Sequence, residues 1–252
     1  MEQNVVLEMC DISKNFTGVR ALSHVDFTLR KGEIHALMGE NGAGKSTTMN
    51  MLTGYISSPS GQILINGIDI LEDPKKAKAN IGYLPEIPPL YIDMTVESYL
   101  GFMYDLKKCK LPRKSHIDDV CNLCRIADVK GRLIKNLSKG YRQRVGLAQA
   151  ILGYPEVIIL DEPTVGLDPK QIIEIRDLIK SLKKKHTVIL SSHILSEVSA
   201  VCDYVLIISH GKLVASDTPE NLGKLAEGSN TLEMLVKGAE KPIKEALEGI
   251  EG

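Results

Sequence analysis

Short apolar runs, each about the length of a β-strand, recur along the chain and alternate with longer segments of helical periodicity. Near the N-terminus, short antiparallel strands are predicted by the runs NVVLEMC and HVDFTL, with Gly18 between them. IHALMG then predicts a buried strand that leads into a glycine-rich turn, and KSTTMNMLTG is typical of the helix that follows. GQILINGIDI returns to strand character. We therefore expect a small antiparallel layer next to a strand–turn–helix unit.

The middle of the chain changes to helical periodicity. YLPEIPPLY is rich in proline, which lacks a backbone donor and restricts the residue before it, so this segment is predicted to be an exposed connection. From Thr95 to about Leu152 apolar residues recur at helical spacing, with Val96 and Leu100 on one face. We expect an inserted helical subdomain over about residues 90–152.

Three more apolar strands are predicted by EVIILDEP, HTVILSSH and YVLIIS. They are separated by the amphipathic segment KQIIEIRDLIKSLKKK and by the shorter ILSEVSAVC. Such repetition of strand, helix and strand predicts right-handed crossovers and a parallel sheet covered on both faces. Lys183, Lys184 and Lys185 end the longer helix, where cations favourably meet the negative end of the helix dipole, so we interpret them as structural.

The pattern changes again after Pro219. Gly228, Ser229 and Asn230 predict a loop, TLEMLV a strand and PIKEALEGI a helix. One strand and one helix rarely bury enough area to fold alone, so this segment either docks on the main body or belongs to a larger, truncated accessory domain.

Composition narrows the class of protein. A chain of 252 residues can bury roughly three quarters of its unfolded surface, so it needs no disulfide scaffold. Its 32 acidic and 31 basic residues nearly cancel, which leaves no overall field to hold the chain on nucleic acid or an anionic bilayer. Neither a signal peptide nor a bilayer-length apolar run is found, and five cysteines suit a reducing cytoplasm. Cys121 and Cys124 form a CxxC without a second pair, so we place them on an ordinary helix.

The glycine-rich turn carries the first candidate chemistry. GENGAGKS, Gly39 to Ser46, fits the pattern GxxxxGK[ST] between a strand and a helix. Glycines let successive backbone N–H groups converge on phosphate oxygens, and the helix N-terminus adds partial positive charge. Lys45 would reach the outer phosphates, and the Ser46 hydroxyl would bind Mg²⁺. The turn predicts binding of a nucleoside triphosphate.

Two carboxylates follow the all-aliphatic strand VIIL. Asp161 is expected to hold Mg²⁺ through water at the carboxyl end of the strand, and Glu162 to orient and deprotonate an attacking water. His193 closes the next strand, VILSSH. Because parallel strands place their carboxyl ends along one rim, where ligands bind, His193 would share that rim with Lys45 and could touch the γ-phosphate.

In their order and spacing, GENGAGKS, LSKGYRQRVGLAQAIL, VIILDEPTVGLDP and VILSSHILSEV resemble the motifs of the ATP-binding subunits of ATP-binding cassette (ABC) transporters. The resemblance covers about residues 4–219. It implies an α/β fold: a P-loop NTPase (RecA-like) core with a parallel sheet, an N-terminal antiparallel β subdomain and an inserted α-helical subdomain. Residues 1–220 would form the nucleotide-binding domain, and residues 221–252 an accessory βα segment.

The resemblance also implies a composite site in a head-to-tail dimer. LSKGY, at Leu137 to Tyr141, takes the place of a signature that begins a helix facing the γ-phosphate held by the other subunit. There Ser138 would supply a hydroxyl and Gly140 an unobstructed N–H. Asp168, in GLDP, would cross the dimer interface beside the partner's phosphate loop.

The remaining cofactor contacts follow from the same resemblance. Phe16 takes the place of the aromatic residue that stacks on adenine. Asn41, Gly42, Gly44 and Thr47 would bind phosphates with the rest of the loop.

Three positions depart from the usual motifs. Lys139 replaces the first glycine of the signature, and its charge either approaches the partner's phosphate or points to solvent. Tyr141 replaces the usual glutamine. Glu86, in YLPEIPP, stands at a position usually held by glutamine, where its carboxylate can still ligate Mg²⁺.

These observations predict an ATPase that dimerises around two Mg-ATP molecules, as a homodimer or with a second ATP-binding subunit, and powers export through separate transmembrane permease subunits. Glu162 would be the general base, with Lys45 and His193 stabilising transition-state charge. The subunit would be cytoplasmic and peripheral on the inner face of the cell membrane. Two alternatives stay open: a non-transport ABC-type ATPase acting on nucleic acid or ribosomes, and a regulatory module without catalysis.

Overall fold

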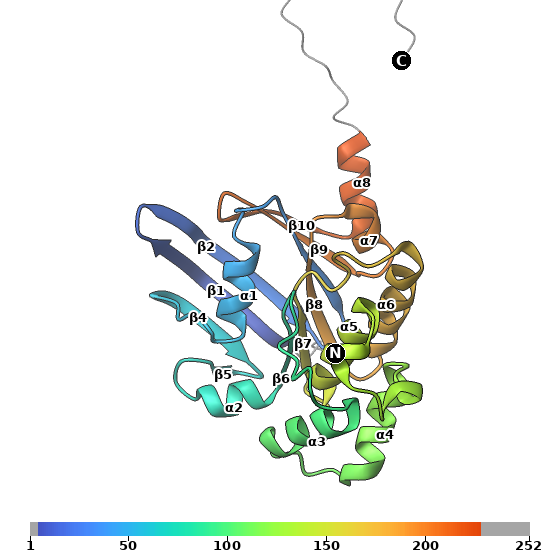
Figure 1. The fold of residues 1–252 in the computed structure, drawn as a ribbon. Helices are drawn as coiled ribbons and strands as arrows, with labels where there is room; N and C mark the ends of the chain where they lie inside the picture. Colours follow the sequence, from blue (N-terminus) through green and yellow to red (C-terminus); the bar gives the residue numbers. More distant parts are fainter. Residues whose placement is uncertain (1–4, 228–252) are drawn as a thin grey trace, which may run out of the picture. The chain divides into compact units, whose positions relative to one another are not determined.

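The computed structural model describes residues 5–227, and two compact units divide the chain between Pro219 and Glu220. Two β-sheets and the helices around them form the first unit (Figure 1). Of the second unit, the described part is helix α8, Pro219–Glu227, at whose start the division falls. The strand and helix predicted near the C-terminus lie outside the described residues.

The smaller sheet is antiparallel, as the N-terminal pattern predicted. Its strand order is β2-β1-β4-β5, made of β1 (Val5–Phe16), β2 (Val19–Arg30), β4 (Ser60–Ile65) and β5 (Ile68–Asp69). Gly18 has a φ of 80° and makes the tight turn between β1 and β2 possible. Alternate residues of β2 are buried from Ser23 to Leu29, and β1 buries Leu7, Met9 and Ile12, so the sheet packs against the core.

The larger sheet has six strands in the order β10-β9-β3-β8-β7-β6. All neighbours are parallel except β10, which is antiparallel to β9. The bounds are β3 Ile34–Met38, β6 Ile81–Leu84, β7 Val157–Leu160, β8 Thr187–Ser192, β9 Tyr204–Ser209 and β10 Lys212–Asp217. Every residue of β3, β7 and β8 is buried, as expected of central strands covered on both faces. The expected parallel α/β core is confirmed.

One hydrophobic core joins the two sheets. Helix α1 (Lys45–Leu52) contributes Met49, Met51 and Leu52 to it, and the parallel sheet contributes Ile159 and Ile189 among others. α1 is therefore held on both sides, which fixes the loop that precedes it. That loop is the candidate phosphate loop.

The helices between β6 and β7 form the green lobe of Figure 1. They are α3 (Val96–Leu106), α4 (Arg113–Leu123), the 3₁₀ turns Ala127–Val129 and Ile134–Asn136, and α5 (Lys139–Ile151). The Thr95 hydroxyl accepts the Ser98 N–H at the start of α3, and the Ser138 hydroxyl accepts the Tyr141 N–H at the start of α5. Cys121 is buried in α4 and Cys124 caps its end, as the structural interpretation of the CxxC predicted.

In the sequence, each of the remaining helices directly precedes a strand of the larger sheet. They are α2 (Pro74–Ala79), α6 (Pro169–Leu182) and α7 (Leu195–Ser199). Four elements were not predicted from the pattern: α2, β6, β10 and α8. α2 exposes nearly all of its side chains, and β6 and β10 are edge strands, so none of them carries a long apolar run.

Candidate nucleotide site

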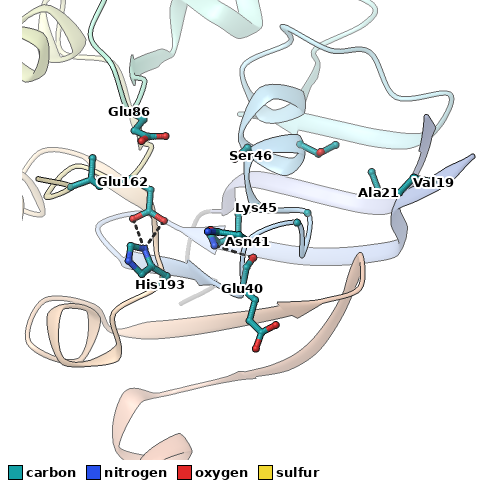
Figure 2. A pocket seen from close by; sticks show the side chains of 13 residues that line it. Val19, Ala21, Glu40, Asn41, Lys45, Ser46, Glu86, Glu162 and His193 are labelled. Atoms are coloured by element: carbon teal, nitrogen blue, oxygen red, sulfur yellow. Dashed lines mark hydrogen bonds and ion pairs between the residues drawn. The ribbon is translucent and has the colours of Figure 1, made fainter. Parts of the chain in front are cut away.

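A pocket of about 330 Å³ opens at the carboxyl ends of β3, β7 and β8, where the segments that leave these strands converge (Figure 2). Most of the residues predicted from the motifs line it: Asn41, Gly42, Gly44, Lys45, Ser46, Thr47, Glu86, Glu162 and His193. These side chains come from separate parts of the chain and meet because the strands that precede them are parallel neighbours.

The loop from Gly39 to Gly44 has no room for side chains at its two ends. A Cβ on Gly39 would lie 2.3 Å from the Ile208 carbonyl oxygen. Gly44 has a φ of 114°, and a Cβ there would lie 2.8 Å from the carbonyl oxygen of Ala21. The backbone thus passes tightly under β2 and β9 into the N-terminus of α1, an arrangement that suits a bound phosphate.

Lys45 is buried, with 7% of its surface exposed, although it carries a charge. Its ammonium group donates hydrogen bonds to the carbonyl oxygens of Gly39 and, at 3.2 Å, Glu40. A buried cation needs such partners to offset the loss of water. Lys45 is therefore already positioned inside the loop, where an anionic ligand would be its strongest partner.

Glu162 and His193 face each other across the pocket from the phosphate loop (Figure 2). The His193 Nδ1 lies 3.2 and 3.1 Å from the two carboxylate oxygens of Glu162, so an Nδ1–H donates to that carboxylate. Glu162 has a left-handed backbone with φ 45°, which is strained for any residue other than glycine. This backbone conformation and the histidine together set the direction of the carboxylate.

Asp161 lies next to the pocket and does not line it. Its N–H donates to the Leu84 carbonyl oxygen, and its Oδ1 accepts the Ser191 hydroxyl at 2.5 Å. The predicted metal ligands Ser46 and Glu86 both line the pocket, and the Glu86 carboxylate faces the loop (Figure 2). Burial, and secondarily the Asp161 carboxylate, raises the pKa of the nearby Tyr83 hydroxyl to about 12.

Phe16, predicted to stack on adenine, does not line the pocket. It ends β1 with 46% of its surface exposed, and the Lys14 ammonium lies 5.5 Å from the centre of its ring. Its cross-strand partner Val19 does line the pocket.

The signature residues also lie outside this pocket. Ser138 caps α5, and Gly140 packs so closely on Gln171 that a Cβ would lie 2.7 Å from that side chain. The Asp168 carboxylate accepts the Gln171 N–H at 2.9 Å and so caps α6. Lys139 lies against Gly166 of its own chain, which was not anticipated.

Sequence reasoning missed several residues of the site. Val19, Ala21, Glu40 and Val165 line the pocket, and Ser191 contacts both acidic residues at the end of β7. Period-two alternation along VILSSH places Ser191 on the same face as His193, which could have indicated it. Val19 and Ala21 are apolar and belong to a different sheet, so only the tertiary fold brings them here.

Comparison with known proteins decides what kind of nucleotide site this is. The family model described as ABC transporter matches residues 22–165, which include the phosphate loop, the signature and both acidic residues. The chain belongs to the ABC transporter family. Within that family it is an ATP-binding subunit and an ATPase.

Named relatives match over most of the chain. The bacitracin transport ATP-binding protein BcrA of Bacillus licheniformis is 37% identical over 223 residues, which cover 88% of this chain and 72% of that protein. The lantibiotic transport ATP-binding protein SrtF of Streptococcus pyogenes is 35% identical and covers 91% of this chain and 95% of its own. Among solved structures, cbiO1 of Clostridium perfringens, part of the ABC transporter complex cbiONQ, has a TM-score of 0.81 at 27% identity, covering 89% of this chain and 93% of its own.

Over residues 5–227, the structure contains no helix with both the length and the apolar character needed to span a bilayer.

Proposed function

We propose that this chain hydrolyses Mg-ATP within a sandwich of two ATP-binding subunits, either two copies of itself or itself and a second such subunit, and so drives export through separate permease subunits. The observation that carries this proposal is the incomplete pocket. Lys45, Glu162 and His193 line the pocket. Ser138 and Gly140, at the start of α5, lie outside it. A partner's α5 would complete it with a helix N-terminus.

The pocket residues divide the work of phosphoryl transfer. The backbone of Gly39 to Thr47, with Asn41, Gly42 and Gly44, would hold the phosphates, and Lys45 would move from its loop carbonyls to the outer phosphate oxygens. Glu162 would take the proton of the attacking water. His193 would hold the carboxylate through Nδ1–H, and as an imidazolium it would also donate Nε2–H to the γ-phosphate. Phe16 would stack on adenine, and Asp168 would cross to the partner's loop.

The donors present fit Mg²⁺. No group of three His, Cys, Asp or Glu side chains among the described residues could hold a metal by itself. Mg²⁺ usually keeps several waters and takes one or two carboxylates plus substrate phosphates, so the Ser46 hydroxyl with Asp161 and Glu86 would be sufficient. When bound, the ion neutralises charge that develops on the transferred phosphoryl group.

An exposed apolar surface supports the permease interaction. It is lined by Leu90, Tyr91, Ile92, Asp93, Met94 and Phe102, where the proline-rich segment meets the helical lobe. Ile87, 82% exposed, lies on the same segment one residue after Glu86. A permease segment that covers this surface would bury apolar area and contact the proline-rich segment, which carries Glu86 into the pocket. The ATPase would thus lie on the cytoplasmic face of the membrane without entering it.

The named relatives support transport over the alternatives. Two of them are named for bacitracin transport and lantibiotic transport, which favours a peptide as the exported substrate. A nucleic-acid or ribosome ATPase has no support in the charge balance of the chain.

The sandwich is tested by the mass of purified Glu162→Gln in size-exclusion light scattering, with and without Mg-ATP. Without the base, ATP should persist and hold two subunits together, so the mass doubles with Mg-ATP. Lys45→Ala keeps the dimer surface but lacks the lysine contact to the outer phosphates, and it should stay monomeric under the same conditions. An equal mass of Glu162→Gln with and without Mg-ATP would count against a sandwich formed by this chain alone.

A further inference from the structure

Ser191 is a fully buried polar residue on β8, with none of its surface exposed, and it cannot touch a nucleotide in the pocket. β7 and β8 are parallel with Leu160 opposite Leu190. The next positions along these strands are Asp161 and Ser191, so the hydroxyl lies beside the point where the chain leaves β7.

The hydroxyl makes two hydrogen bonds whose directions are fixed by chemistry. The Glu162 N–H can only donate, so the Ser191 oxygen accepts it, at 2.9 Å. The single hydroxyl proton then goes to Asp161 Oδ1, at 2.5 Å. One side chain thus ties together the backbone of Glu162 and the carboxylate of Asp161.

This tie acts where the backbone is strained. Glu162 has φ 45°, a conformation that a side chain other than glycine adopts only when its surroundings hold it there. His193 restrains the Glu162 carboxylate, and Ser191 restrains its amide. Without the hydroxyl, the amide would lose its acceptor and Glu162 could relax toward an unstrained backbone, which would move the carboxylate away from the pocket.

We propose that Ser191 is a positioning residue for hydrolysis: it accepts the Glu162 N–H and so holds Glu162 in its left-handed conformation, with the carboxylate directed into the pocket. The inference rests on the proposed role of Glu162 as base. It concerns the rate of the chemical step and predicts little change in nucleotide affinity, since Ser191 is not part of the pocket lining.

The test compares Ser191→Ala with Ser192→Ala. Ser192 is the adjacent residue of the same strand, is also buried, and its hydroxyl accepts the Ile194 N–H instead. Ser191→Ala should lower kcat about tenfold, which corresponds to about 1.4 kcal/mol, and leave KM for ATP within about threefold. Ser192→Ala should keep kcat within about threefold of the parent.

A double-mutant cycle asks whether Ser191 works through Glu162. In a Glu162→Gln background, Ser191→Ala should change the single-turnover rate less than about twofold, because the base that it positions is already gone. A tenfold loss in both backgrounds would overturn the proposal, as would a kcat of Ser191→Ala within twofold of the parent.

Amide hydrogen exchange of the nucleotide-free protein tests the hydrogen bond from the Glu162 N–H to Ser191 without any catalysis. In ¹⁵N-labelled Ser191→Ala the Glu162 amide should exchange at least about tenfold faster, while the amides of Val157–Leu160 keep the parental rates. Unchanged exchange at Glu162, or faster exchange along all of β7, would overturn the proposal. A parent that releases no phosphate would contradict the proposed function instead, and the amide rates would still decide whether Ser191 holds Glu162.

Discussion

At the scale of single residues, the site depends on charged groups that are held in place before any ligand arrives. Lys45 is 7% exposed and bonded to the carbonyls of its own loop, and Glu162 is bonded to His193. Such preorganised groups need little rearrangement during phosphoryl transfer, which is why their removal is costly.

We expect Lys45→Ala to abolish measurable ATP binding, with affinity at least about 100-fold weaker, because the loop loses the cationic side chain that would bond the outer phosphates. A direct binding measurement with a fluorescent ATP analogue checks this. Lys76→Ala removes an exposed lysine that pairs with Asp73 and should leave affinity unchanged. Unchanged affinity in Lys45→Ala would show that the loop does not hold the phosphates.

Which residues could be predicted depended on whether their position is fixed locally. Gly39, Gly44, Lys45 and Ser46 follow from one loop whose geometry requires those residue types, and the sequence therefore located them. Val19, by contrast, lines the pocket only because the antiparallel sheet packs beside the loop, and no local pattern contains that information.

At the scale of elements, an ion pair joins the signature helix α5, in the helical lobe, to α6. The Arg144 guanidinium forms an ion pair with Glu174 of α6, with side chains 11% and 31% exposed, and also donates to the Arg125 carbonyl oxygen at 3.4 Å. The last turn of α5 is held as well, because the Lys107 ammonium donates to the carbonyl oxygens of Gln149 and Ala150. α5 is thus held near its middle and at its C-terminal end, which fixes its direction.

Glu174→Ala should lower the free energy of unfolding by about 2 kcal/mol, because it leaves the Arg144 charge largely buried without its partner. The double variant Arg144→Met with Glu174→Leu should cost less than Glu174→Ala alone, since no unpaired charge remains. Urea denaturation of the three proteins gives these values. Lys135→Ala, which breaks an exposed pair with Asp93, serves as control and should cost less than about 1 kcal/mol. Equal losses for Glu174→Ala and Lys135→Ala would contradict the link.

Elements were predictable where they bury a long apolar run. β3, β7 and β8 are buried throughout and were recognised as strands, whereas β6 spans four residues that include Gly82 and takes its place at the sheet edge from tertiary pairing with β7. α2 buries only Ala77, so its helix depends on the Asp73 cap and Pro74 rather than on periodicity.

At the scale of the whole molecule, three buried histidines link stability to pH. His35, His116 and His186 are at most 4% exposed, and burial lowers the pKa of each below its ordinary value. His116 Nε2 accepts the Gly153 N–H, which requires that nitrogen to be unprotonated.

The free energy of unfolding should therefore fall as pH drops below about 6.5, because the unfolded chain then binds protons that the folded chain excludes. The slope for three such groups is at most about 4 kcal/mol per pH unit. Urea denaturation between pH 7.5 and 5.5 measures it. His116→Gln keeps an acceptor for Gly153 but no titrating ring, so its slope should be shallower than that of the parent. An identical slope would exclude His116 as a source.

The most direct test of the central claim is phosphate release from Mg-ATP by the parent and by Glu162→Gln at equal nucleotide occupancy. If Glu162 is the general base of an ABC ATPase, the parent turns over while Glu162→Gln binds ATP equally well and hydrolyses it at least about 100-fold more slowly. Equal rates for the two proteins would contradict the role assigned to Glu162, and with it the catalytic arrangement built around Lys45 and His193.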